Sequence, residues 1–327
     1  MKKLIGITLF LVLLYVALLN ADPSASSAQN HYNLGKRIGF FGLISLGAGL
    51  LIIAGGIDLS IGSVIGLSAT CGAMLLAGEF PYYKHAVSPW LTIPLLLLGG
   101  ALIGWIHGVL VTKGGLQAFV VTLCGLFIYR GLARWLAGDV QQGLQGQLRD
   151  WKQFLYSKPL SFDVLDYSIR IPKFFLIFIG LLLVVTVLLH FSVYGRYWFA
   201  LGGNEKAARY SGIATDRYKI AAYMFCSMLA AWAGFLYLME QDSAQPSDTG
   251  NFYELYAIAG AVLGGCSLRG GEGSAPGIFI GTAILILLPN FSNMLGLKSE
   301  LEYVVIGAAL LFASMMDEFL RRRVSSG

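Results

Sequence analysis

The stretch GRYWFALGGNEKAARYSGI, residues 195–213, is the most polar segment between two strongly apolar blocks of the chain. Asn204 is a residue type that caps helix N-termini, Glu205 suits the first turn of a helix, and Gly212 suits its end. Arg209 follows Glu205 by four residues, the spacing of an ion pair on one helix face. The pattern predicts a helix of about two turns, which is too short to be stable alone in water. We therefore expect a protein partner or the membrane surface to support it.

The composition of the 327-residue chain is that of an integral membrane protein. It is 56% hydrophobic and 13% charged, whereas soluble domains carry about 25% charged residues. The apolar residues come in blocks close to the ~20 residues that a helix needs to cross a bilayer, and not in the alternating segments of ~10 residues typical of an outer-membrane barrel. The sequence therefore predicts an all-α, polytopic helical bundle.

Small residues are expected to pack the helices of this bundle. Glycine is frequent, with 41 residues, which suits membrane helices that approach each other closely. Gly100, Gly104 and Gly108 recur every four residues and so share one helix face. The four cysteines have no CxxC spacing and are predicted to be small buried residues, not disulfide or zinc partners: Cys71, Cys124, Cys226 and Cys266.

About ten transmembrane helices are predicted, some of them broken or re-entrant, in a single membrane domain over residues 1–327. The first apolar block also resembles a cleaved secretory signal over residues 1–21, but it lacks a strong A-x-A site, and a retained helix gives an even number of spans. We favour the retained helix. The predicted spans are residues 4–19, 38–54, 61–77, 90–112, 118–137, 172–190, 218–239, 253–268, 275–291 and 301–316.

The distribution of Lys and Arg sets the predicted orientation through the positive-inside rule. With Lys2 and Lys3 inside, alternation puts an excess of loop Lys and Arg in the cytoplasm. Both termini and the loop 193–217, which holds the opening stretch, are then cytoplasmic. The aromatic and charged segment 138–171 is then external, either as an interfacial cap or as a landing surface for an extracytoplasmic protein.

The sequence lacks the residue patterns of an enzyme. No HExxH motif or GxSxG elbow occurs, and no GxxxxGK[ST] loop is present to hold nucleotide phosphates. The chain is therefore expected to leave ATP hydrolysis to another chain and to bind no cofactor and no metal. The formal charge of +5 comes from basic residues scattered beside apolar blocks, which is typical of topology signals and not of a nucleic-acid surface.

Few ionisable side chains fall within the predicted spans. His107 is the only His deep in the membrane, and we favour a neutral hydrogen bond between helices over a functional role. Arg130 and Arg134 lie four residues apart in the fifth span, where they either face a pathway or extend toward the interface.

Two glycine-rich stretches interrupt the apolar blocks: GGIDLSIGS, residues 55–63, and GGCSLRGGEGS, residues 264–274. The second has no phosphate-loop Lys and is typical of a tight turn or a broken helix. Backbone that leaves the helix at membrane depth must be buried in protein or line water, so paired interruptions indicate a solute path. We expect this pathway to include Asp58, Ser60, Ser63, His107, Gly264 and Gly265.

Four motifs in collinear order carry a resemblance to a known family: GGIDLSIGS, GRYWFALGGNEKAARYSGI, the SAQP of residues 243–246, and ELYAIAGAVLGGCSLRGGEGS of residues 254–274. Together they resemble the permease subunits of bacterial ABC sugar importers of the ribose, xylose and galactoside type. The match covers most of the chain, and the first helix and segment 138–171 match least. The family usually has Ala at Gly260 and Thr at Cys266, changes between small residues that we do not expect to alter the fold.

The resemblance implies a transport subunit in the bacterial inner membrane. It implies that two permease subunits, a second copy or a paralogue, form the pathway for a sugar. A separate ABC ATPase would hold ATP and Mg, and an extracytoplasmic solute-binding protein would deliver the solute. Membrane lipid is an expected partner, and nucleic acid is not. The family's contact with the ATPase corresponds to Gly202, Gly203, Asn204, Glu205, Ala207, Ala208, Gly212 and Ile213.

Other functions stay open at this point. An ion-coupled secondary transporter would place carboxylates within spans, and Asp58 is the one plausible candidate. A non-catalytic membrane scaffold would use the basic region 196–219 as a lipid-binding surface. A membrane enzyme would need a reactive constellation that the sequence does not offer. Similar permeases carry purine nucleosides or other small polar solutes, and the sparse polar residues of the spans do not choose among these cargoes.

Overall fold

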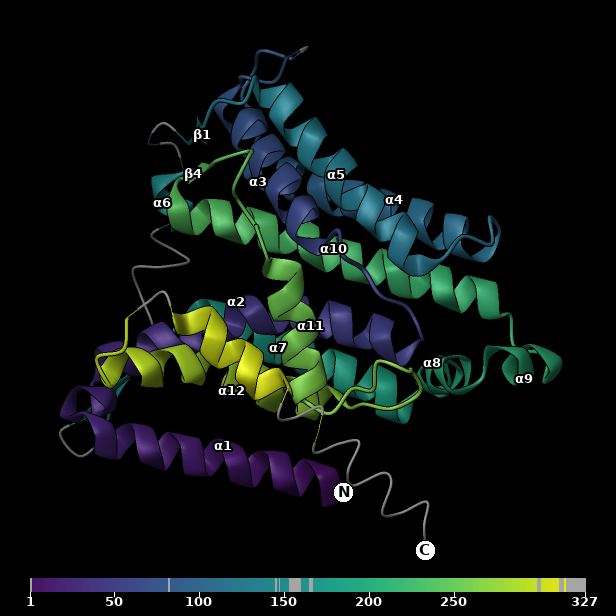
Figure 1. The fold of residues 1–327 in the computed structure, drawn as a ribbon. Helices are drawn as coiled ribbons and strands as arrows, with labels where there is room; N and C mark the ends of the chain where they lie inside the picture. The colour runs from purple at the N-terminus through teal and green to yellow at the C-terminus, as the bar shows by residue number, and fades with distance from the viewer. Residues whose placement is uncertain are drawn as a thin grey trace, which may run out of the picture.

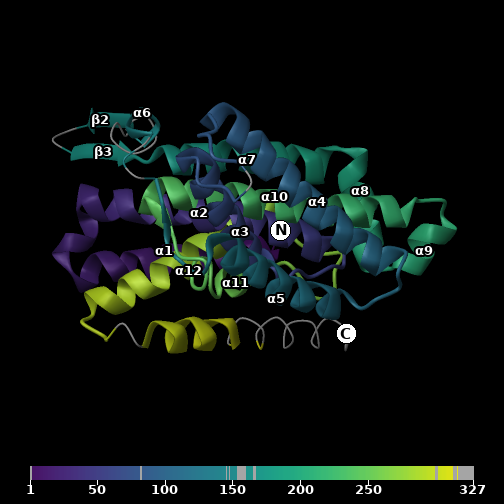
Figure 2. The ribbon, with the colours of Figure 1, turned by 90° about the horizontal axis from the view of Figure 1, so that it is seen from above.

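The computed structural model describes residues 2–81, 83–144, 146, 148–152, 160–164, 167–298, 301–311 and 315. In this part of the chain the protein is a bundle whose long helices run roughly along one common direction, and α11 (Tyr253–Leu263) lies steeply across them (Figures 1 and 2). Among the described residues, seven helices are long and apolar enough to cross a membrane. They are α1 (Lys2–Ala21), α2 (Ala28–Ile53), α4 (Pro89–Thr112), α5 (Ala118–Ala137), α7 (Lys173–Phe191), α10 (Thr215–Gln241) and α12 (Ala275–Met294).

Three further apolar helices are shorter: α3 (Ile61–Ala77), α11 (Tyr253–Leu263) and the helix Glu302–Leu311. Each of the ten predicted blocks therefore falls on a helix where the structure describes it, with residues 312–314 and 316 of the tenth outside the described residues, and the all-α polytopic fold is confirmed. The eighth predicted span is the clearest difference, because α11 has only 11 residues and ends at Leu263, not at residue 268. At about 1.5 Å per residue it is too short to cross a ~30 Å hydrocarbon core.

The remaining elements are small and lie near the ends of the bundle. Two-residue strands β1 (Gln142–Gly143) and β4 (Ser243–Ala244) pair antiparallel, and β2 (Leu160–Val164) forms a hairpin with β3 (Tyr167–Ile171). These strands and α6 (Arg149–Lys152) lie in or beside the segment predicted to be external, of which residues 145, 147, 153–159 and 165–166 lie outside the described residues. The other short elements are η1 (Pro23–Ser26), α8 (Val193–Gly203) and α9 (Glu205–Tyr210).

Helices α2 and α10 form the centre of the bundle. Helix α2 is buried along most of its length and contacts α7, α10, α11 and α12, while α10 contacts α2, α3 and α4. The predicted glycine face of α4 packs on α10: a methyl group on Gly100 would lie 2.6 Å from the carbonyl oxygen of Ser227, and one on Gly108 would lie 2.7 Å from the Cα of Ile220. Because the clashing atoms are backbone, glycine is needed for this approach.

The start of α3 meets the start of α11 inside the bundle. Figure 1 shows the chain running back from the end of α2 to the start of α3 in the interior, and α11 beginning close to α3 and α10. A methyl group on Gly62, in the first turn of α3, would collide with the carbonyl oxygen of Gly250 and the carboxylate of Glu254. The N-terminal ends of α3 and α11 therefore face one another, a contact that was not predicted from the sequence.

The two ends of the bundle carry different parts of the chain. Helix α9 and the first residues of α1 lie at one end, and β1, β4 and α6 lie at the opposite end (Figure 1). Helix α1 packs on α12, with Leu14 and Leu18 buried and a 2.6 Å hydrogen bond between Tyr15 Oη and the His31 ring.

Candidate functional site

The polar stretch of residues 195–213 forms the end of α8 and the whole of α9. Asn204 has the extended backbone of an N-cap, and its side-chain oxygen accepts a 3.0 Å hydrogen bond from the amide of Ala207. Gly212 has a φ of +83° just after the helix, a conformation that glycine adopts without strain. The predicted cap, the short helix and its glycine end are confirmed, and the helix is six residues long.

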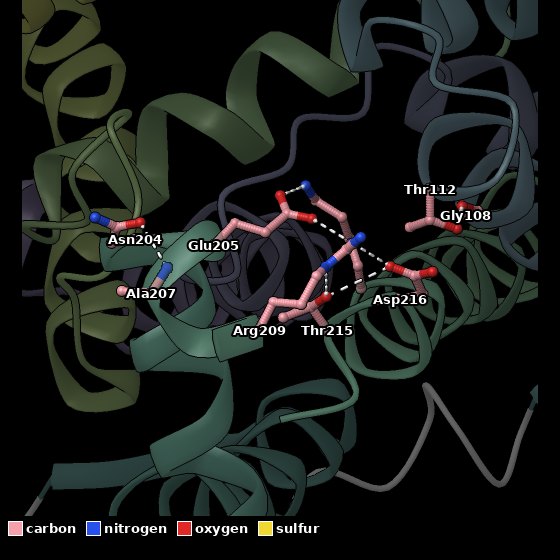
Figure 3. Close-up of polar contacts among 9 residues, drawn as sticks. Gly108, Thr112, Asn204, Glu205, Ala207, Arg209, Thr215 and Asp216 are labelled. Atoms are coloured by element: carbon pink, nitrogen blue, oxygen red, sulfur yellow. Dashed lines mark hydrogen bonds and ion pairs between the residues drawn. The ribbon is translucent and has the colours of Figure 1, made fainter. Parts of the chain in front are cut away.

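Ion pairs hold α9 against the start of α10 (Figure 3). Glu205 accepts a 2.6 Å hydrogen bond from Lys219 and lies 3.6 Å from Arg209, while Arg209 lies 2.6 Å from Asp216. Arg209 also donates to the Thr215 hydroxyl at 3.1 Å. The pair between Glu205 and Arg209 was predicted from its spacing. The shorter contacts to α10 were missed, although Asp216 and Lys219 are visible in the sequence as charges at the end of the loop and just after it.

The other predicted coupling residues lie in α9 or next to it. Ala208 is buried, Ala207 is exposed, and the amide of Ile213 donates to the carbonyl of Ala208 at 3.1 Å. A groove of about 370 Å³ lies beside the end of α9, lined by Tyr197, Ser211, Gly212, Ile213, Ala214 and Tyr218.

Gly202 joins α8 to the interior of the bundle. A methyl group there would collide with the carbonyl oxygen of Ile53, the last residue of α2, and would lie 2.5 Å from the amide nitrogen of Gly271. The Gly271 amide itself donates to the Ile53 carbonyl at 2.9 Å. Gly55 and Gly270 adjoin the same point, with φ of +75° and +86°. We call these five residues the glycine junction; it brings α2, α8 and the loop before α12 into direct backbone contact.

Asp58 is the centre of a buried polar cluster in the interruption between α2 and α3. Its carboxylate is 1% exposed and accepts hydrogen bonds from the amide of Ser60 at 2.8 Å and from the Ser60 hydroxyl at 2.7 Å. The Ser227 hydroxyl of α10 donates to the other carboxylate oxygen at 3.4 Å. Asp58 and Ser60 thus lie together, whereas Ser227 was not singled out from the sequence.

His107 of α4 adjoins this cluster. Its Nε2 shares a 2.9 Å hydrogen bond with the Tyr129 hydroxyl of α5, and its Nδ1 lies 3.9 Å from the Asp58 carboxylate. Tyr223 of α10 packs edge-on against the same ring and donates to the carbonyl of Ile57 at 3.3 Å. The favoured interpretation of His107, a hydrogen bond between helices, agrees with this geometry. Both tyrosines were missed because apolar helices contain many aromatic residues.

The remaining predicted pathway residues lie elsewhere. Ser63 is buried in the first turn of α3. Gly264 follows α11 and packs on α12, since a methyl group on it would collide with the carbonyl of Gly277, and Gly265 turns the chain with a φ of +90°. The structure therefore brings Asp58, Ser60 and His107 together and gives the two glycines a packing position between α11 and α12.

The two arginines of α5 have different surroundings. Arg130 is partly buried and donates to the carbonyls of Pro246 and Thr249, at 3.1 and 2.7 Å, so it fixes the chain that leads into α11. Arg134 is exposed and pairs with Asp139 at 2.6 Å. The hydrogen bonds from Arg134 hold the pKa of the Asp139 carboxyl below its usual range.

Residues 33–314 of this sequence match the model of the family described as branched-chain amino acid transport system, permease component. The chain belongs to this family. It is therefore the permease component of a transport system, and the multi-pass bundle is its membrane part. No solved structure matches it.

Several curated permeases are similar over nearly the whole length. The ribose import permease protein RbsC of Bacillus subtilis is 37% identical over 94% of this chain and 90% of its own length. The protein of the same name from Escherichia coli K12 is 33% identical over 95% of this chain and 92% of its own length. The L-arabinose transport system permease protein AraH of E. coli K12 is 29% identical over 97% of this chain and 91% of its own length.

Proposed function

We propose that this permease forms the membrane pathway of a sugar importer whose energy comes from ATP hydrolysis on a separate ABC ATPase. The observation that carries the proposal is the attachment of α9. This short helix lies at one end of the bundle, and ion pairs join it to α10. A partner that moves α9 therefore moves α10, which packs along α2, α3 and α4.

The glycine junction gives α8 and α9 a second route into the bundle. Gly202 touches the end of α2, from which residues 54–60 lead to Asp58 and the start of α3. In a contact between two backbones, no side chain can change its rotamer to absorb a displacement, so the displacement is passed from one segment to the other. The arrangement suits an input at α9 with an output at the buried polar cluster, which supports coupling through Gly202, Gly203, Asn204, Glu205, Ala207, Ala208, Gly212 and Ile213.

The solute class rests on the relatives. Ribose and arabinose, in whose transport systems the similar permeases act, are both pentoses, so we propose a pentose as the first cargo to test. Asp58 and His107 are the candidate polar contacts near the path. A solute-binding protein outside the membrane and a second permease copy or paralogue complete the proposed importer, with both termini of this chain in the cytoplasm.

The test is co-purification combined with uptake. The permease is expressed with its cognate ATPase, and bound ATPase and uptake of labelled ribose and arabinose are measured. Coupling predicts that Glu205→Lys removes the ATPase and abolishes uptake, because it places a third cation beside Lys219 and Arg209. Glu205→Gln, which keeps a hydrogen-bond acceptor, is the matched control. Normal ATPase binding and uptake in Glu205→Lys would refute the assignment of α9.

A further inference from the structure

A second groove adjoins the first and shares Ala214 and Tyr218 with it. It has a volume of about 470 Å³ and is lined by Leu188, Tyr194, Trp198, Ala214, Arg217, Tyr218 and Ala221. We propose that this groove binds an anionic phospholipid, with the acyl chain along α7 and the headgroup phosphate at Arg217.

The apolar end of the groove opens onto the outer face of α7. Leu183, Val184, Val187 and Phe191 expose 62, 62, 59 and 77% of their surface, an apolar strip of the kind that faces lipid. Leu188, between the last two, is also in the groove. The lining therefore continues a surface that the hydrocarbon of the bilayer already covers.

The groove is fixed by aromatic contacts at the end of the bundle. Trp198 donates from its indole nitrogen to the carbonyl of Tyr218 at 2.9 Å. Tyr218 packs edge-on against Tyr197, with ring centroids 4.9 Å apart, and lies 6.3 Å from Tyr194. Trp and Tyr favour the level of lipid headgroups, where one side of the ring is apolar and the other is wet. A groove that is already formed loses little conformational freedom when a lipid enters it.

The charge around the groove is positive. From α8 to the start of α10 the chain has five basic residues and two acidic ones, and both acidic residues, Glu205 and Asp216, are paired with Arg209 and Lys219. Arg196, Lys206 and Arg217 form no ion pair with any described residue. Of these three, Arg217 lines the groove. A phospholipid can place its phosphate at Arg217 and its acyl chains against the apolar lining of the groove. An acidic protein surface would pair with Arg217 only.

The experiment titrates the purified full chain with phosphatidylglycerol and with phosphatidylcholine of the same acyl chains, and counts bound lipids by native mass spectrometry. One Arg near a headgroup is expected to favour the anionic lipid about fivefold. Arg217→Gln is expected to abolish this preference. Arg196→Gln, which removes an equal charge from an exposed site outside the groove, is the matched control and is expected to keep it.

A second variant tests the apolar part without changing the charge. Ala221→Trp fills the groove and is expected to weaken the binding of both lipids by a similar factor. The proposal is overturned if the preference for phosphatidylglycerol survives Arg217→Gln, if Arg196→Gln reduces it equally, or if Ala221→Trp leaves both lipids unchanged. Unchanged lipid binding in Arg217→Gln with loss of the ATPase or of a second permease copy would also overturn it, and would assign the groove to a protein contact.

Discussion

Two adjacent glycines at the end of α8 have opposite surroundings, which permits a matched test of the glycine junction. In Gly202→Ala the new methyl carbon would lie 2.5 Å from the Gly271 amide nitrogen, about 0.9 Å inside the 3.4 Å at which ordinary van der Waals contact begins. It would also collide with the Ile53 carbonyl oxygen. A methyl group on Gly203 meets nothing within 4 Å. Only the first substitution therefore forces α8 away from α2.

The expected magnitude follows from two opposing effects. Overpacking against unyielding backbone costs about 1–3 kcal/mol, whereas alanine is favoured over glycine in a helix by about 1 kcal/mol. The helix effect is common to both variants, so the difference between them isolates the packing cost. We expect Gly202→Ala to be less stable than Gly203→Ala by about 1–3 kcal/mol.

The assay compares the thermal unfolding of both purified variants and the hydrogen exchange of the Gly271 amide. Gly271 donates to Ile53 at 2.9 Å, and this bond must lengthen if α8 is displaced. Faster exchange at Gly271 is therefore expected in Gly202→Ala and not in Gly203→Ala. Equal unfolding temperatures and equal exchange in the two variants would refute the proposed contact between α8, α2 and the loop before α12.

Three further substitutions test the polar contacts. Asp58→Ala leaves the Ser60 amide and hydroxyl buried without their acceptor and should destabilise the chain by about 1–3 kcal/mol. If Asp58 belongs to the pathway, the variant should lose more uptake than assembled transporter. A measurement of uptake per purified complex would show this. Tyr129→Phe and His107→Phe should show a coupling free energy of about 0.5–1.7 kcal/mol in a double-mutant cycle of unfolding, and additive effects would contradict the hydrogen bond. Glu205→Gln should cost no more than about 1 kcal/mol, because the ion pairs of this residue are partly exposed; a larger loss by thermal unfolding would mean that α9 is anchored mainly by Glu205.

Local features of the helices were predictable, because hydropathy and capping depend on neighbouring residues. The ten apolar blocks, the Asn204 cap and the Gly212 end all depend on spacings of a few residues. The shorter α11 shows the limit of hydropathy: Gly264 and Gly265 are compatible with an apolar span by composition, but the chain turns at Gly265 with a φ of +90°. The pair of glycines was noticed, yet the helix end was placed too late.

Contacts between distant segments were not predictable from one sequence. Asp58 meets Ser227, which is 169 residues away, and Gly202 meets Ile53 and Gly271 from two other parts of the chain. Tyr129 and Tyr223 resemble the many other aromatic residues of apolar helices until the fold brings them to His107. Strands β1 and β4 are two residues each, too short for an alternating pattern to appear.

The glycine junction also explains why the interruption before α3 belongs with the polar loop and not only with the buried cluster. Gly55 adjoins Gly202, and three residues later Asp58 accepts its hydrogen bonds from Ser60 at the start of α3. Between them, the carbonyl of Ile57 accepts a hydrogen bond from Tyr223 of α10. Helix α10 is in turn joined to α9 by the ion pair between Lys219 and Glu205. The segment 55–58 is thus connected to α9 at both ends, through Gly202 of the preceding helix α8 and through α10. A rigid displacement of α9 would therefore move this whole segment, whereas a displacement of only one attachment would have to break the Tyr223 hydrogen bond or the Gly202 contact.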